Sequence, residues 1–318
     1  MTTPRAVCVT EDPALRRTLR RILQAAGSNV EFADSADALD ASTPPQLIVL
    51  DPKSRRSADT ARLSERFGQG TEVVMLGESL DTEDIVRALR HRSFNHLISE
   101  LLDPDEVELV VTSVKMLKGD IFGLEKYLAW GVLVRQVDVS GYDDKRGALL
   151  EVAEYAKEVG ARRQMVARIE SVTDELLMNA LYDAPAIRYG VRPRISERTR
   201  AGVGPIGDEQ VILRFASDGR YFAVSARDAY GELKKEAILD NLARARAERG
   251  SPQARSEDGR GAGLGLYFIL SSVTRFIANI CPGQTTEVIC LFDLKASGRE
   301  VENCAKSLHV FVAPTIAS

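Results

Sequence analysis

The sequence predicts an α/β protein built from two domains, and three observations support this prediction. The chain has 318 residues, which is more than one ordinary hydrophobic core accommodates and suits two. In the first 118 residues, five short apolar runs alternate with helical patterns, which indicates a doubly wound parallel sheet. From residue 131 to 318, apolar runs form hairpin patterns between helical segments, which indicates a second α/β domain. We therefore expect domains at 1–118 and 131–318, joined by a connector at 119–130.

The composition argues against several functional classes. A net charge of −4 with 28% charged residues provides no strong basic surface, so nucleic acid is not an expected partner. The four cysteines show no paired short spacing, and with three histidines in the whole chain they make a poor zinc site. We expect them to be reduced core residues of a cytoplasmic protein.

The sequence also lacks the patterns that direct a chain to a membrane. Glu11 and Asp12 follow soon after a short apolar run at the N-terminus, which is wrong for a signal peptide. Nowhere do about 18 apolar residues run together, as a membrane-spanning helix requires. We expect a soluble, cytoplasmic chain with no membrane partner.

The elements of the first domain follow from apolar runs and helical spacing. Strands are predicted at residues 6–10, 30–33, 47–50, 73–76 and 96–98. Leu15, Leu19 and Ile22 keep helical spacing up to Gly27 and predict the first helix. Further helices are expected after residue 33, near 82–90 and over 105–117.

Three carboxylates fall at the ends of predicted strands. Glu11 and Asp12 follow the first strand, and Asp51 follows the third. In a parallel α/β sheet the functional crevice lies at the carboxyl ends of the strands. Clustered carboxylates there would hold a hard cation such as Mg²⁺.

Residues 5 to about 118 resemble the receiver domain of bacterial response regulators, the flavodoxin-like module of two-component signalling. By that resemblance, Glu11 and Asp12 match the metal-binding acidic pair and Asp51 the phosphoacceptor. Two positions depart from the family pattern: Gly77 stands where a hydroxyl residue is expected, and Glu100 where a lysine is expected. An anion in place of that cation turns attraction into repulsion, on the order of 4 kcal/mol each way for charges about 4 Å apart near a surface.

Two interpretations of this domain follow. We favour a pseudo-receiver used for docking or dimerisation over a working phosphoacceptor. A third interpretation of Asp51, as a solvated residue at a strand end, stays open.

The connector at 119–130 contains no long Pro or Ser tract, so we expect a continuing helix more than a flexible tether.

In the second domain, helices are predicted at 147–158, 162–183 and 233–247, and from the glycine run at 261–265 to about 273. Strands are predicted at 132–139, 211–216, 221–226, 276–281, 286–292 and 308–312. Ala184 and Pro185 are expected to end the second of these helices.

One helix of the second domain carries a polar stripe. Glu175, Asn179 and Asp183 lie four residues apart and therefore share one face, while Leu176 and Ala180 belong to an apolar face. The stripe suits either a helix that lines a polar pocket or a solvated outer face. The motifs downstream favour the pocket for Glu175 and Asn179, and leave Asp183 as a helix-end residue.

Two further motifs follow in order. Asp228 and Gly231 stand at the end of a predicted strand, and Gly261, Gly263 and Gly265 open an apolar helix. The glycine run lacks the Lys-Ser or Lys-Thr of a P-loop and the third glycine of a dinucleotide fingerprint. It suits a turn whose amides meet phosphate at a helix N-terminus, or a flexible loop.

The three motifs in this order resemble the N, G1 and G2 boxes of the GHKL (Bergerat-fold) ATPases and kinases, over residues 130 to about 295. The resemblance implies a two-layer α/β sandwich that binds ATP and Mg²⁺. It also implies that Asn179 ligates Mg²⁺, that Glu175 acts as or orients a general base, and that Asp228 accepts a hydrogen bond from the adenine amino group. The glycines at 231, 261, 263 and 265 would complete the pocket, the last three closing over phosphate.

Histidine discriminates between the branches of this family. His91, His96 and His309 do not lie on a dimerisation helix before the ATP domain, as a histidine kinase requires. The order of strand, helix and N-box helix is similar to that of the anti-sigma-factor serine kinases. Tyr230 departs from the family, which usually has glycine there, and would narrow the adenine pocket.

Three functional hypotheses remain, the first of which we favour. The chain binds ATP-Mg and phosphorylates or sequesters a protein partner, such as an antagonist of the sigma or anti-sigma type. Alternatively, it is a non-catalytic ATP-binding scaffold, or an atypical histidine kinase acting on its own receiver. A homodimer is compatible with each hypothesis.

Overall fold

The computed structural model describes residues 3–51, 53, 63, 65–67, 70–77, 83–99, 106–190, 210–249, 264–296 and 306–313. The chain divides into two compact units. Unit 1 comprises Met1–Ile121 and Lys306–His309, and unit 2 comprises Phe122–Ala305 and Val310–Ser318. Both units combine helices with a sheet, which confirms the predicted α/β class.

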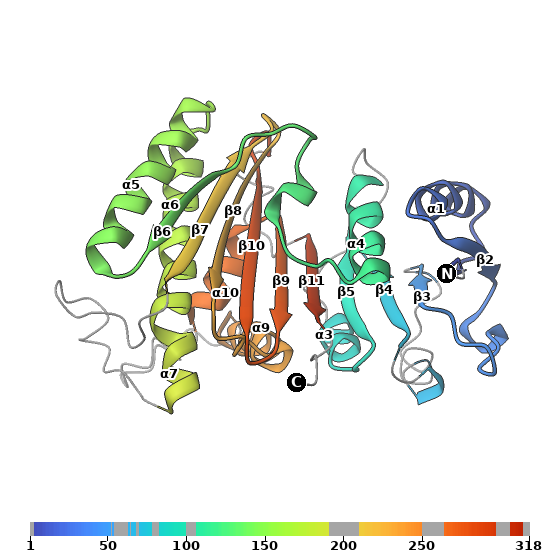
Figure 1. The fold of residues 1–318 in the computed structure, drawn as a ribbon. Helices are drawn as coiled ribbons and strands as arrows, with labels where there is room; N and C mark the ends of the chain where they lie inside the picture. The colour runs from blue at the N-terminus through green and yellow to red at the C-terminus, as the bar shows by residue number, and fades with distance from the viewer. Residues whose placement is uncertain are drawn as a thin grey trace. The chain divides into compact units, whose positions relative to one another are not determined.

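Unit 1 is built on a parallel sheet (Figure 1). Its strands are β1 (Arg5–Val9), β2 (Asn29–Ala33), β3 (Leu47–Leu50), β4 (Glu72–Leu76) and β5 (Phe94–Ile98). They lie in the order β2-β1-β3-β4-β5 and pair in parallel, which is the flavodoxin-like order. A later strand, β11 (Ser307–Val312), pairs antiparallel with β5 through Ser307–His309.

Helices α1 (Pro13–Ala25) and α4 (Glu106–Lys118) contact each other and share one core with the sheet. Leu19, Leu23 and Leu109 are fully buried in this core, as helical spacing predicts. Helix α3 (Glu83–Leu89) contacts β5. The helix predicted after residue 33 is only a 3₁₀ turn, η1 (Ala36–Ala38), which ends where Leu39 takes an extended backbone conformation.

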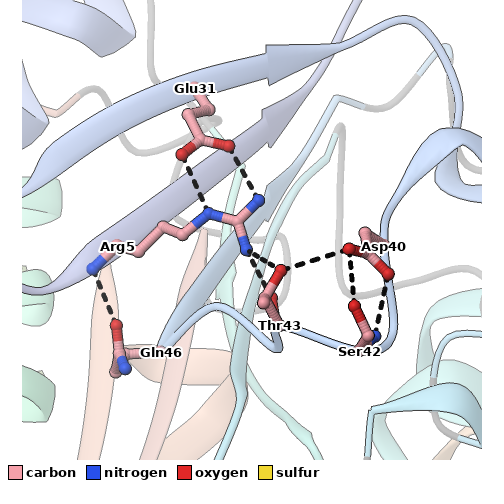
Figure 2. A network of polar contacts seen from close by, with 6 residues as sticks. All are labelled: Arg5, Glu31, Asp40, Ser42, Thr43 and Gln46. Atoms are coloured by element: carbon pink, nitrogen blue, oxygen red, sulfur yellow. Dashed lines mark hydrogen bonds and ion pairs between the residues drawn. The ribbon is translucent and has the colours of Figure 1, made fainter.

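An arginine network ties the start of β1 to its neighbours (Figure 2). The Arg5 guanidinium donates to both oxygens of Glu31 on β2, at 2.9 and 2.8 Å, and also reaches Thr43 before β3. The Arg5 backbone N–H donates to Gln46 Oε1 at 2.7 Å. The hydrogen bond from Arg5 lowers the pKa of the Glu31 carboxyl. The network therefore fixes three adjacent chain segments where β1 begins.

Unit 2 is built on an antiparallel sheet with the order β9-β10-β8-β7-β6. Its strands are β6 (Arg135–Val139), β7 (Val211–Ser217), β8 (Tyr221–Asp228), β9 (Arg275–Cys281) and β10 (Thr285–Asp293). Gly219 and Gly283 take positive φ in the two hairpin turns, where glycine meets no steric penalty. Both hairpins agree with the prediction from their turn residues, and β6 is shorter than predicted.

The α-helices described in this unit are α5 (Tyr142–Glu158), α6 (Arg163–Met178), α7 (Ala184–Tyr189), α9 (Lys235–Arg249) and α10 (Leu264–Ser272). Helix α6 packs on β8 and α5 packs on β6, and Figure 1 shows α5 and α6 side by side. Helix α10 contacts both α6 and α9. Unit 2 is thus a layer of helices on an antiparallel sheet.

The helix that carries the polar stripe does not end at Pro185, which corrects the sequence prediction. After α6 the chain forms one π-helical turn, η4 (Asn179–Asp183), and continues as α7 to Gly190, a left-handed C-cap with φ of 65°. Pro185 has no N–H for the carbonyl of Leu181, and its ring crowds that carbonyl. The wide turn accommodates the proline because Ala184 N–H bonds to the Asn179 carbonyl instead.

The connector is not a continuing helix. Helix α4 ends at Lys118, and Gly119 follows with a positive φ of 71°. In unit 2, the short helix η3 (Leu124–Tyr127) contacts β7 and β8. Gly123 N–H donates to the buried Glu287 carboxylate at 2.8 Å. The segment from residue 122 is therefore an ordered part of the second unit.

Candidate functional site

The first contact of the candidate site joins α6 to α10. A Cβ atom added to Gly265 would lie 1.5 Å from Glu175 Oε1 and 2.2 Å from Cδ. The Glu175 carboxylate therefore lies directly against the backbone of the first turn of α10, in the space that a β-carbon at position 265 would take. Two motifs far apart in the sequence meet at this point.

Asn179 occupies a special place in the same helix. It is the first residue of the π turn, one helical turn after Glu175, and both residues are half-buried. π turns within α-helices recur at functional sites, because they re-aim the side chains around them. Asp183 ends the π turn and is also half-buried, but the chain continues directly into α7, so the predicted helix-end role of Asp183 is wrong.

A tight turn follows β8 and contains the second motif. Asp228 is 8% exposed, and its Oδ1 accepts the backbone N–H groups of Tyr230 at 2.8 Å and Gly231 at 3.1 Å. Burial raises the pKa of this carboxyl, although its backbone hydrogen bonds oppose the rise. Gly231 has φ of 67°, and a Cβ there would lie 2.2 Å from the Cys281 carbonyl oxygen. Asp228 and Gly231 thus hold the turn against the β9–β10 hairpin.

Helix α7 reaches the same turn. Arg188 Nη1 lies 3.3 Å from Glu232 Oε1. The rings of Tyr189 and Tyr230 pack edge to face with centroids 6.2 Å apart. Tyr230 is 4% exposed, so its side chain is buried where it contacts α7. Through α6, the π turn and α7, one continuous helical rod contacts both later motifs.

The rest of the glycine motif lies outside the described residues. Gly261 and Gly263 are in the range 250–263, and Glu100 of the first domain is in 100–105. Their predicted roles stay predictions.

The predicted acidic site of unit 1 has a different character. Asp51 is 5% exposed and accepts hydrogen bonds from Thr10 Oγ1 at 2.5 Å and from Lys53 N–H at 3.0 Å. Asp12 caps α1 by accepting from Ala14 N–H at 2.8 Å, and this bond lowers the pKa of its carboxyl. Glu11 is exposed.

These carboxylates are not gathered into a metal centre. Within the described part of the chain, no three His, Cys, Asp or Glu side chains are placed to hold a metal ion. The magnesium site predicted at Glu11, Asp12 and Asp51 stays a prediction. Gly77 donates its N–H to the Ile98 carbonyl.

Unit 1 contains a buried histidine pair that sequence patterns did not indicate. His309 Nε2 lies 2.9 Å from Glu108 Oε1, and His309 Nδ1 lies 3.3 Å from His96 Nδ1. Both histidines are buried. His309 lies more than 200 positions from each of its partners, so no local spacing predicts these contacts.

A lysine beside the polar stripe was also missed. Lys145 is buried on α5 and contacts Asp174 on α6. A signal was present, because Lys145, Ala148 and Val152 share the buried face of α5 at helical spacing.

The chain matches no family model and no curated protein. Among solved structures, it is similar to the signal receiver domain of an HD domain-containing protein from Pseudomonas fluorescens Pf-5, with 18% identity and a TM-score of 0.32, over 38% of this chain and 93% of that one. The beryllofluoride-activated NtrC receiver domain is 23% identical with a TM-score of 0.30, over 36% and 97% of the two chains. The SiaB-SiaC complex from Pseudomonas aeruginosa is 14% identical with a TM-score of 0.31, over 51% of this chain and 89% of that one.

Among the described residues, no helix is both long and apolar enough to cross a membrane.

Proposed function

We propose that unit 2 binds ATP with Mg²⁺ and transfers a phosphoryl group to a serine or threonine of a protein partner, or sequesters that partner. One observation carries the proposal. The helical rod from α6 to α7 contacts Gly265 through Glu175 and contacts the Asp228 turn through Arg188 and Tyr189. The helix that carries the first motif therefore contacts the two later motifs, as a nucleotide pocket of the GHKL type requires.

The donor chemistry of this helix face suits the proposed ligand. The carboxamide oxygen of Asn179 would bind Mg²⁺, which supplies charge neutralisation at the phosphate oxygens. Glu175 would accept the proton of the attacking hydroxyl, or orient the group that does so. Gly265 has no side chain, so the Glu175 carboxylate lies directly against the backbone of the first turn of α10.

Asp228 would recognise the base. Its Oδ1 already accepts the N–H groups of Tyr230 and Gly231, and a carboxylate has about four acceptor positions. An adenine amino group would use a remaining position. The buried carboxylate would then gain a donor where burial disfavours its charge.

For unit 1 we propose docking or dimerisation, without phosphorylation of Asp51. Both Asp51 oxygens accept hydrogen bonds within the unit, and the carboxyl is almost fully buried. Incubation with acetyl phosphate and Mg²⁺ should leave Asp51 unmodified by intact mass. An acid-labile adduct that Asp51→Asn removes would reject this role.

Calorimetry tests the nucleotide site directly. Asn179→Ala should abolish the Mg²⁺ dependence of ADP binding, because it removes the proposed metal ligand. Ser171→Ala is a suitable control, since Ser171 lies exposed on α6 and bonds its own helix through the Ala167 carbonyl. Unchanged affinity in Asn179→Ala would reject the site.

A non-catalytic scaffold is the second candidate, and the buried Tyr230 favours it because the family has glycine there. Labelled ATP and candidate partners separate the two functions. Transfer that Glu175→Gln removes supports the kinase, whereas tight ATP binding without transfer supports the scaffold. His96 and His309 are poor phosphoacceptors for an atypical histidine kinase, because both rings are buried and contact each other. Acid-stable label that Asp51→Ala leaves unaffected would exclude it.

A further inference from the structure

Helix α5 carries a buried cation that the proposed chemistry does not use. The Lys145 side chain is 9% exposed. It occupies the face of α5 that also buries Ala148 and Val152, where an apolar residue is the ordinary choice. A cation in such a place needs a specific partner, because burying an unpaired charge is costly.

That partner lies on α6. Lys145 Nζ is 2.6 Å from Asp174 Oδ1 and 3.3 Å from Met178 Sδ, and it lies 5.6 Å from the centre of the Tyr142 ring. The Asp174 side chain is 45% exposed, so the pair joins a buried cation to a half-solvated carboxylate. The ammonium therefore contacts two successive turns of α6.

The two contacted residues stand immediately before the two proposed site residues. Asp174 precedes Glu175, and Met178 precedes Asn179. Each step along an α-helix turns the side chain by about 100°. The stripe that Lys145 contacts is therefore adjacent to the stripe of the site, and rotation of α6 about its axis would move both together.

Stability alone does not explain a lysine here. Replacing a buried ion pair by apolar residues is often neutral or stabilising, because desolvation offsets the attraction. An ion pair at 2.6 Å nevertheless constrains geometry more than an apolar contact does, because it has a preferred direction and distance. The free-energy cost of burying a lysine on this face is consistent with a role in orienting α6.

We propose that Lys145 is a positioning residue that fixes the rotation of α6, and thereby aims Glu175 and Asn179 into the site. The expected effect of Lys145 on MgADP affinity rests on the proposed nucleotide function. Its effect on the orientation of α6 does not depend on any ligand. The pair also lies just before the π turn, so it restrains α6 at the point where the helix begins to widen.

The decisive variant is Lys145→Met, which keeps length and apolar packing but removes the charge. We expect a melting temperature within a few degrees of wild type, faster hydrogen exchange of the backbone amides in 174–183, and MgADP affinity reduced about tenfold. Lys145→Arg, which can still bond Asp174, should recover most of both losses. Val152→Ala is the matched control, because it removes buried volume from the same helix without touching the ion pair.

The outcomes separate the two proposals. If wild type binds no MgADP, the proposed function fails, while hydrogen exchange still decides the role of Lys145. Unchanged exchange and affinity in Lys145→Met overturn the positioning role. It is also overturned if Lys145→Arg is as impaired as Lys145→Met, or if Val152→Ala loses affinity in equal measure, since either result describes a merely structural residue.

Discussion

At the scale of single residues, a substitution at Gly265 tests the placement of Glu175 most directly. A Cβ there would overlap the Glu175 carboxylate, which is the flexible end of a side chain and can move away. Gly265→Ala should therefore leave the fold intact, and it should stabilise α10 by up to about 1 kcal/mol through helix propensity. Displacement of Glu175 should still reduce phosphoryl transfer at least about tenfold, as misplaced catalytic groups do.

Gly147 is the control for this substitution. It lies within α5, and a Cβ added there would meet no atom within 4 Å, so Gly147→Ala should give a similar helix stabilisation without loss of transfer. Thermal unfolding and a transfer assay on both variants check the pair. Equal transfer in the two variants would contradict the placement of Glu175.

Asp228 links the site to pH. Its pKa is raised by burial, so folding favours the protonated carboxyl. The stability that this preference contributes is complete below the ordinary aspartate pKa of 3.8 and is lost as pH rises through the raised value. Relative to Asp228→Asn, wild type should therefore become less stable as pH rises above about 4. Denaturant titration at a series of pH values measures the free energy of unfolding of both proteins. If the two free energies change with pH in parallel, the pKa of Asp228 is not raised.

At the scale of elements, Pro185 determines where α7 points. It removes the N–H that would bond the Leu181 carbonyl, and the π turn absorbs the mismatch. Pro185→Ala allows an ordinary α-helix, which should raise helix stability but rotate α7 away from the Asp228 turn. We expect weaker MgADP binding together with an equal or higher melting temperature.

Tyrosine packing provides an independent check on this rotation. Tyr189 contacts Tyr230 only if α7 keeps its direction. Tyr189→Ala should therefore weaken binding without the rise in melting temperature that Pro185→Ala produces. If Pro185→Ala binds normally, the direction of α7 does not matter to the site.

At the scale of the whole molecule, a strand from the end of the sequence completes the first unit. Ser307–His309 pairs with β5, and His309 contacts Glu108 and His96 in the interior. His309→Ala should destabilise unit 1 by about 1–3 kcal/mol, because it removes a hydrogen bond to a buried carboxylate. Hydrogen exchange at β5 and β11 should report the loss, whereas His91→Ala, which lies outside the pair, should change little. Unaltered protection of β11 in His309→Ala would refute the role of this contact.

Elements were predictable from the sequence where the signal is local. Apolar runs marked the strands of both units, and the turn residues marked the two hairpins. The prediction was wrong at Pro185. A proline usually ends a helix, but here the helix widens into a π turn and continues. Lys145 carried a helical-spacing signal, yet its partner Asp174 is not deducible from that spacing.

The sequence by itself determined which segments become helices and strands, because the periods of 3.6 and 2 residues and the turn preferences act between near neighbours. It also placed Glu175, Asn179, Asp228 and the glycines in an order that predicts a nucleotide site. Only the tertiary structure decided that Glu175 lies against Gly265, that α7 reaches the Asp228 turn, and that His309 meets His96. Such contacts depend on how helices and strands pack against each other. These elements are far apart in the chain, so no single segment of sequence determines their packing.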